Sequence, residues 1–214
     1  MWIECEHNSD EWDLIRCDKI TGSSIPKIMA NYPKSFGEPA KNLAVNIAVA
    51  QITGLPSVNN RFTNPHMDRG HEQEPEAIHR YTEQTMNFVE KNLMYVDGDL
   101  ACSPDFVIND RKSIGDIKSV VSGTHYRNIM RKDFDPAYKW QFYFNMWLCK
   151  SEFFDFVSFC ADFPYENSIF ICRKELDSTI FEQMENRINQ FRVLINEIKE
   201  NINSSSYFIG DSYA

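Results

Sequence analysis

The chain has 214 residues, 43% of them hydrophobic and 25% charged, which is enough to bury one substantial core and too little for two. A formal net charge of −9 argues against indiscriminate nucleic-acid binding, because non-specific affinity comes mainly from Lys and Arg that neutralise phosphates. With no apolar run of membrane-spanning length and no signal-peptide pattern at the start, we expect one domain over residues 1–214, in the cytoplasm and without a membrane.

The amino-terminal part is predicted to be mostly helical. A helix is expected to begin within Ile20 to Pro26, where hydroxyl residues precede an early proline, and its free N–H groups would attract anions. Apolar residues at helical spacing predict a second helix over 38–53 and a third over 68–85, with a loop at 59–65 between them. Glutamates crowd the first turns of the third helix.

The apolar period then changes from helix to strand. Segments 86–96, 100–108 and 113–121 are short and rich in β-forming residues, and turn residues separate them, which predicts an antiparallel meander. Asp105 and Asp116 would lie on its two later strands.

The remainder of the chain alternates between the two kinds of element. Helices are expected near 122–132 and 136–149, strands at 153–161 and 167–173, and a long amphipathic helix at 176–202. Helices on both sides of a central sheet predict a mixed α/β domain.

The motif Asp116-Ile117-Lys118 places an acid and a base on one strand. Residues two apart project from the same face, so Asp116 and Lys118 converge while Ile117 points into the core. Asp105 can reach the same point from the neighbouring strand across a tight turn. Clustered carboxylates that hold Mg²⁺, with a cation beside them, suit phosphodiester hydrolysis. The Asp and Lys of an isolated Asp-x-Lys motif are more often solvent-facing residues on an edge strand. The motif therefore needs support from its context.

That support comes from four blocks that occur in order along the chain. Over roughly residues 10–160 the chain resembles the phage lambda exonuclease (viral alkaline exonuclease, or YqaJ-type viral recombinase) family of the PD-(D/E)xK nuclease superfamily. The matching blocks are Trp12 to Arg16 with Ile20 to Ser23; Gly70-x-x-x-Glu74; Ala101 to Asp105 with Asp116 to Lys118; and Ala137-Tyr138-x-x-Gln141 to Met146-Trp147. The chain departs from the family's pattern at Phe106, where the family often has Gly, and at Asp116, where it often has Glu.

The resemblance implies a restriction-endonuclease-like core, a central mixed sheet flanked by helices, and a role for each matched position. Asp105, Asp116, the Ile117 carbonyl and Glu74 would hold two Mg²⁺ or Mn²⁺ ions. Lys118 would orient or activate the attacking water, and Gln141 would position water or phosphate. From the residues alone, Glu74 is equally well an exposed acid near a helix start.

A 5′-phosphate pocket is implied at Arg16, Ser23 and Ser103. Arg carries a planar fork of donors suited to phosphate oxygens, and Ser23 lies at an expected helix start. The residues taken alone favour a helix cap at Ser23, a turn at Ser103 and a surface charge at Arg16.

The resemblance further implies an activity and its partners. The chain would be a 5′-to-3′ double-strand exonuclease that leaves 3′ single strands for phage-type recombination in a bacterial host, acting as a ring-shaped homotrimer with a single-strand annealing protein. Two alternatives stay open: a restriction- or repair-type endonuclease on the same fold, and a catalytically inactive DNA-binding subunit.

Overall fold

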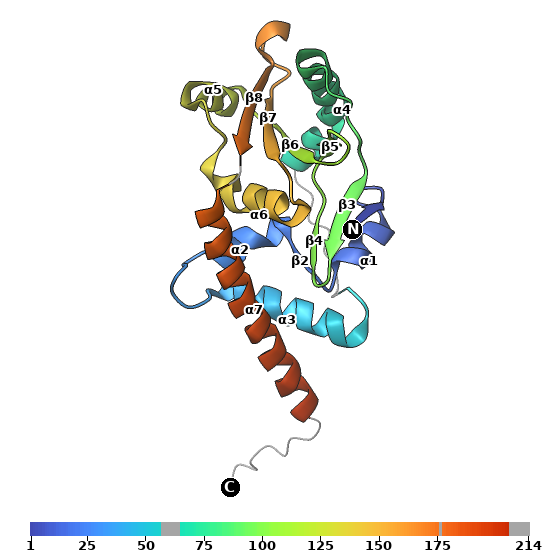
Figure 1. The fold of residues 1–214 in the computed structure, drawn as a ribbon, viewed down its shortest axis with the longest axis vertical. Helices are drawn as coiled ribbons and strands as arrows, with labels where there is room; N and C mark the ends of the chain where they lie inside the picture. Colours follow the sequence, from blue (N-terminus) through green and yellow to red (C-terminus); the bar gives the residue numbers. More distant parts are fainter. Residues whose placement is uncertain (57–64, 176, 206–214) are drawn as a thin grey trace.

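The computed structural model describes residues 1–56, 65–175 and 177–205, with side chains of the helix that begins at Pro65 described from Arg69 onward (Figure 1). The loop expected at 59–65 lies outside this part of the chain except for Pro65, which already belongs to a helix. Within the described residues, no helix combines the length and apolar content needed to cross a membrane.

The amino-terminal part is mainly helical, as predicted. Its elements are β1 (Trp2–Glu4), α1 (Asp10–Arg16), β2 (Ile20–Thr21), the 3₁₀ turn η1 (Gly22–Ser24), α2 (Ile25–Met29), α3 (Glu38–Thr53) and α4 (Pro65–Thr85). The Ser9 side chain caps α1 by accepting a hydrogen bond from the Trp12 N–H. Gly54 ends α3 with φ 68°, a left-handed conformation that glycine adopts without strain.

The remainder of the chain alternates strands and helices. Its elements are β3 (Leu93–Asp97), β4 (Leu100–Cys102), β5 (Phe106–Ile108), β6 (Ser113–Ser119), α5 (Ser122–Arg131), η2 (Pro136–Tyr138), α6 (Lys139–Cys149), β7 (Phe153–Phe159), η3 (Tyr165–Asn167), β8 (Ile169–Glu175) and α7 (Ser178–Ser204).

The strands form two four-stranded mixed sheets, in the orders β1-β3-β4-β2 and β5-β6-β7-β8. This confirms a mixed α/β fold, but the prediction of one meander was wrong. The expected strand at 100–108 divides into β4 and β5, one in each sheet, because Pro104 has no N–H to continue a ladder. Asp105 therefore lies just before β5 rather than within a strand. β3 begins only at Leu93.

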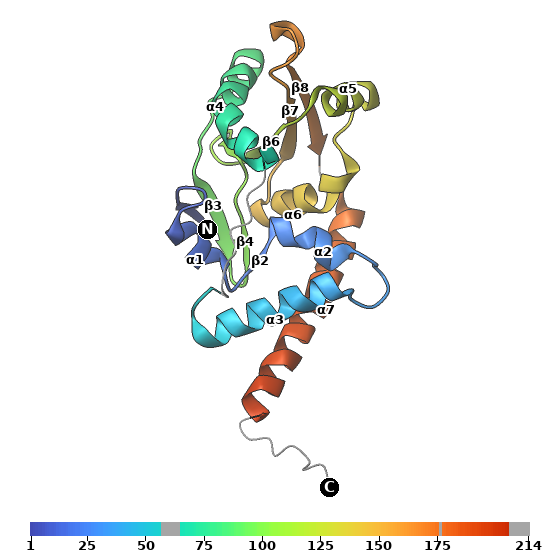
Figure 2. The same ribbon diagram turned by 180° about the vertical axis from the view of Figure 1, so that it is seen from behind.

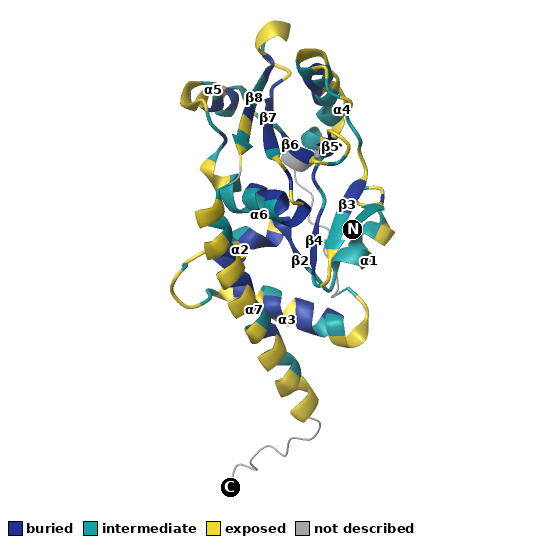
Figure 3. Ribbon diagram, viewed as in Figure 1, coloured by how far each residue is buried: buried dark blue, intermediate teal, exposed yellow. Residues whose placement is uncertain are grey.

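Helices cover both faces of the second sheet, and the side chains of its strands alternate between them. Phe106, Ile108 and Ile117 pack with α4, whereas Val107 and Ile114 belong to the larger core around α6. Figures 1 and 2 show α6 between this sheet and the layer of α2, α3 and α7. Figure 3 shows the buried residues concentrated around α6 and the strands, while the last turns of α7 are exposed.

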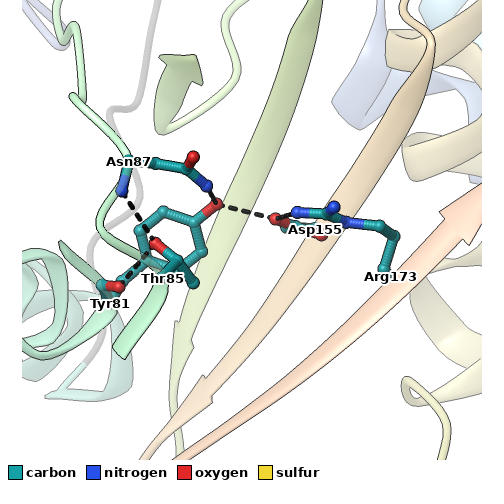
Figure 4. A network of polar contacts seen from close by, with 5 residues as sticks. All are labelled: Tyr81, Thr85, Asn87, Asp155 and Arg173. Atoms are coloured by element: carbon teal, nitrogen blue, oxygen red, sulfur yellow. Dashed lines mark hydrogen bonds and ion pairs between the residues drawn. The ribbon is translucent and has the colours of Figure 1, made fainter. Parts of the chain in front are cut away.

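A polar network fastens α4 to this sheet (Figure 4). Fully buried Asp155, on β7, accepts a hydrogen bond of 2.7 Å from the Tyr81 hydroxyl of α4. Arg173, on β8, donates from Nε and Nη2 to both oxygens of the same carboxylate, each at 2.8 Å. Asn87 supports the Tyr81 oxygen from the chain that follows α4, at 3.2 Å. Burial, together with the Asp155 contact, raises the pKa of Tyr81, so its hydroxyl stays a donor.

Candidate active site

A pocket of about 680 Å³ opens where the two sheets meet. Its walls come from α1, η1, the first half of α4, the link from β4 to β5, the end of β6, and α6. All nine residues that the sequence singled out line it: Arg16, Ser23, Glu74, Ser103, Asp105, Asp116, Ile117, Lys118 and Gln141. Arg16 and Gln141, which are 125 positions apart in the sequence, thus line the same cavity.

Asp105, Asp116 and Lys118 form the centre of the pocket. Lys118 Nζ lies 3.8 Å from Asp105 Oδ2 and 3.8 Å from Asp116 Oδ1. Asp116 and Lys118 share a face of β6 because they are two residues apart. Asp105 is held in place by the Ile117 N–H, which donates to its Oδ2 at 2.7 Å. The Asp105 carboxylate thereby accepts a hydrogen bond from the backbone of β6 just before β5 begins.

At this centre two carboxyl groups face a single ammonium group, so positive charge is lacking. Burial is the main reason that the pKa of Asp116 is raised to about 7; Lys118 opposes the shift, and the charge of Asp105 adds to it. Burial also lowers the pKa of Lys118, but the two aspartates more than offset it and leave that pKa above its ordinary value. Added positive charge beside the two carboxylates would stabilise the ionised form of Asp116.

Glu74 lines the same pocket but does not join the two aspartates. Its Oε1 pairs with Lys91 Nζ at 2.8 Å. In the described part of the chain, no three His, Cys, Asp or Glu side chains are grouped closely enough to hold one metal ion. The structure thus assembles a pair of carboxylates, and the role of Glu74 as a third stays a prediction.

Ile117 and Gln141 occupy the positions that the sequence led us to expect. The Ile117 side chain is buried in the cluster under α4, which confirms that it points into the core. Gln141 lies on α6 and is half-buried in the pocket wall. Both line the cavity beside the aspartates, whereas their assigned roles rest on the resemblance.

Arg16, Ser23 and Ser103 converge on a second subsite. The Arg16 guanidinium donates from Nη1 to Ser103 Oγ at 3.2 Å and from Nη2 to Ser23 Oγ at 3.3 Å. It lies 3.8 Å from the centre of the Trp12 ring, and the Trp12 indole N–H also donates to Ser103, at 3.0 Å. Burial lowers the pKa of Arg16 to about 10, so it remains a cation near neutral pH. The structure confirms the predicted proximity of the three residues.

Trp12 and Asn145 contact the candidate site residues, although the sequence assigned neither of them a role. Trp12 stood in a matching block but received no role, although an aromatic ring beside an arginine four positions away was a usable signal. Asn145 received none either; it lies one helical turn after Gln141 and donates from Nδ2 to Asp116 Oδ2 at 3.3 Å. A polar residue among the aromatic residues of the expected helix was the signal that could have pointed to Asn145.

The donor set fits a hard divalent cation. Two adjacent carboxylates supply oxygen ligands of the kind that Mg²⁺ and Mn²⁺ prefer, and the raised pKa of Asp116 indicates a carboxyl group that lacks sufficient positive charge around it. Such a pair leaves coordination positions for water and a phosphate oxygen, as Mg²⁺ sites with few protein ligands do.

The sequence matches one described protein family. The YqaJ-like viral recombinase domain matches residues 11–152 of the chain. No curated protein sequence matches it.

Solved structures share the fold. An alkaline exonuclease (LHK-Exo) from Laribacter hongkongensis, solved alone and in complex with dAMP, aligns over 92% of this chain and 98% of its own, with TM-score 0.80 and 23% identity. A phage-related exonuclease from Haemophilus somnus 129PT aligns over 86% and 96%, with TM-score 0.64 and 20% identity. At these identities the likeness establishes a common fold.

Proposed function

Because the chain belongs to the YqaJ-like viral recombinase domain family, we propose that it is a metal-dependent deoxyribonuclease that digests double-stranded DNA from its ends. One observation carries the proposal: Lys118 lies 3.8 Å from both Asp105 and Asp116, in the cavity that also holds Arg16. The fold shared with alkaline exonucleases supports the same class of activity.

The two aspartates and Lys118 have separate tasks in this proposal. Asp105, Asp116 and the Ile117 carbonyl would hold two Mg²⁺ ions, with Mn²⁺ as a substitute. When bound, the metal supplies Lewis-acid stabilisation of charge on the phosphate and the leaving oxygen. Lys118 orients the attacking water or stabilises the same charge, and its raised pKa keeps it an ammonium donor. Glu74 would exchange Lys91 for the ion, and Gln141 would hold the phosphate or the water.

The subsite of Arg16, Ser23 and Ser103 is the reason for proposing action at DNA ends. Arg16 presents its donors to two hydroxyls rather than to bulk solvent, so a phosphate could replace those weaker acceptors at little cost in ordering. Held there, a terminal 5′-phosphate would place the next phosphodiester bond near the aspartates. This arrangement favours 5′-to-3′ digestion that leaves 3′ single strands.

The family suggests how the product would be used. A 3′ strand is the substrate for a single-strand annealing protein, and we propose such a partner in phage-type recombination within the cytoplasm of a bacterial host. A homotrimeric ring around DNA would let a protein of net charge −9 stay on its substrate. Light scattering would then give a mass near three chains of 25.0 kDa.

Digestion of end-labelled linear duplex, with and without Mg²⁺, tests the activity. Only metal-containing reactions should release nucleotides, a 5′ label should be lost before a 3′ label, and covalently closed circles should stay intact. Cutting of closed circles would assign an endonuclease on this fold. DNA binding with no cleavage in either metal would assign a catalytically inactive subunit.

A further inference from the structure

Asn145 lies between the two parts of the pocket, the centre formed by the two aspartates with Lys118 and the subsite around Arg16. Its side chain is buried, with a relative exposure of 1%, and its Nδ2 donates to Asp116 Oδ2 at 3.3 Å. Its Oδ1 is buried and has no hydrogen-bond partner. The same oxygen lies against Gly22, the first residue of η1: a Cβ at Gly22 would be only 2.1 Å from it. The amide therefore fills the space between β6 and η1.

Both neighbours of this amide belong to the proposed machinery. Asp116 is one of the two candidate metal ligands. Gly22 immediately precedes Ser23, whose hydroxyl accepts a hydrogen bond from Arg16 at 3.3 Å. Real Cβ contacts essentially never fall below 3.0 Å, so alanine at position 22 would force the buried amide to move. The position of Asn145 is thus fixed from both sides.

We propose that Asn145 is a positioning residue that couples the phosphate subsite to the metal pair. Its Nδ2 holds Asp116 toward Asp105 and Lys118, and its contact with Gly22 sets how closely η1 can approach that pair. The inference rests on the proposed metal-dependent activity. The competing explanation is that Asn145 only fills space in the core around α6.

Asn128 provides a matched control for that explanation. It is also an asparagine with a relative exposure of 1%, its Nδ2 donates to Ser158 at 3.1 Å, and its Oδ1 is buried without a partner. It lies on α5, outside the pocket. A change from Asn to Leu at either position removes an amide of similar size, so a purely structural effect should be alike in both.

The experiment measures Mn²⁺ binding to the DNA-free protein by the loss of the free-ion electron paramagnetic resonance signal. Outer-sphere partners of metal ligands typically contribute about tenfold to a hundredfold to affinity, so Asn145→Leu should weaken Mn²⁺ binding by about that factor while Asn128→Leu leaves it unchanged. Equal affinity in wild type and Asn145→Leu would overturn the inference and leave the proposed function standing. A wild type that binds no Mn²⁺ would remove the proposed function itself.

A double-mutant cycle tests the coupling between the halves. Gly22→Ala should weaken Mn²⁺ binding although Gly22 is not near a metal ligand in sequence, because it displaces the Asn145 amide. In an Asn145→Ala background, which makes room for the extra methyl group, Gly22→Ala should have no further effect. Additive effects on Mn²⁺ affinity would show that the two residues act independently and would overturn the coupling. Far-ultraviolet circular dichroism confirms that each variant compared is folded.

Discussion

Two buried aspartates lie on neighbouring strands of the second sheet and differ in how their charge is balanced. Asp155, on β7 and under α4, is bound by both donors of Arg173 and by the Tyr81 hydroxyl, all within 2.8 Å. Asp116, on β6 and under α6, has Lys118 at 3.8 Å and the Asn145 amide at 3.3 Å. The first carboxylate is saturated by the protein, whereas the second is short of positive charge. A buried acid indicates a site when its partners fall short, and not simply because it is buried.

The largest contrast is expected in catalysis. Asp116→Ala or Asp105→Ala removes a proposed metal ligand, so single-turnover digestion of linear duplex should fall by several orders of magnitude. For Asp116→Ala the thermal midpoint should stay the same or rise, because a poorly compensated buried carboxyl group is removed. Near-wild-type digestion by either purified variant would sink the active-site assignment.

The opposite pattern is expected at Asp155. Asp155→Ala leaves the buried Tyr81 hydroxyl without its acceptor and should lower the free energy of unfolding by about 3 kcal/mol, the low end for a broken buried pair because Arg173 is half-exposed. For a chain of this size the thermal midpoint should fall by roughly 6–12 °C. Calorimetry measures both quantities, and Asp155→Asn, which keeps an acceptor, should recover part of the loss. If Asp155→Ala melted like wild type while losing Mn²⁺ binding, the two aspartates would have been assigned the wrong roles.

A smaller effect is expected at the phosphate subsite. Charge-assisted hydrogen bonds contribute roughly 1.5–3 kcal/mol each, so Arg16→Ala should slow digestion of 5′-phosphorylated duplex by about tenfold to a hundredfold. Duplex with 5′-hydroxyl ends never makes this contact and should be affected much less. Equal slowing on both substrates would show that Arg16 supports the fold or the metal centre instead.

The last expected effect concerns pH. In the folded, metal-free protein the pKa of Asp116 is raised to about 7. Between roughly pH 4 and pH 7 the folded protein therefore keeps a proton on Asp116 that the unfolded chain has already lost. The stability of the metal-free wild type, relative to Asp116→Asn, should therefore fall as pH rises through that window. Denaturant titrations in chelator measure this difference. Added Mg²⁺ should restore the lost stability above about pH 7, since the ion binds the ionised carboxylate. A pH-independent difference would contradict the unbalanced charge at Asp116.

Local sequence patterns predicted that Asp105, Asp116 and Lys118 would lie together in the pocket. Asp116 and Lys118 share a face because strand side chains alternate, and a short turn brings Asp105 alongside. The proposed phosphate subsite had no such basis, because 87 positions separate Arg16 from Ser103, to whose hydroxyl it donates. Only the resemblance predicted that these residues would share a pocket, and the match of the YqaJ-like domain over residues 11–152 confirms the family.

Other features needed the structure. The ion pair between Glu74 and Lys91 forms because the chain that follows α4 passes close to Glu74. The spacing of residues along the sequence does not predict that path. The contact between Asn145 and Gly22 joins two elements far apart in the chain. The division into two sheets was readable in principle from Pro104, but a short apolar run on each side favoured one continuous strand. The trimer, the annealing partner and the polarity of digestion stay predictions.

The link from β4 to β5 limits the distance between the two parts of the pocket. Ser103 and Asp105, which belong to different halves, are joined by two peptide units, so their Cα atoms can be no more than roughly 7 Å apart in any conformation. The covalent geometry of the link therefore limits the distance from the proposed phosphate subsite to the two aspartates. A strand held by its terminal phosphate would be cut at a fixed step from its end, whatever its base sequence, because bond lengths and not base contacts define the step.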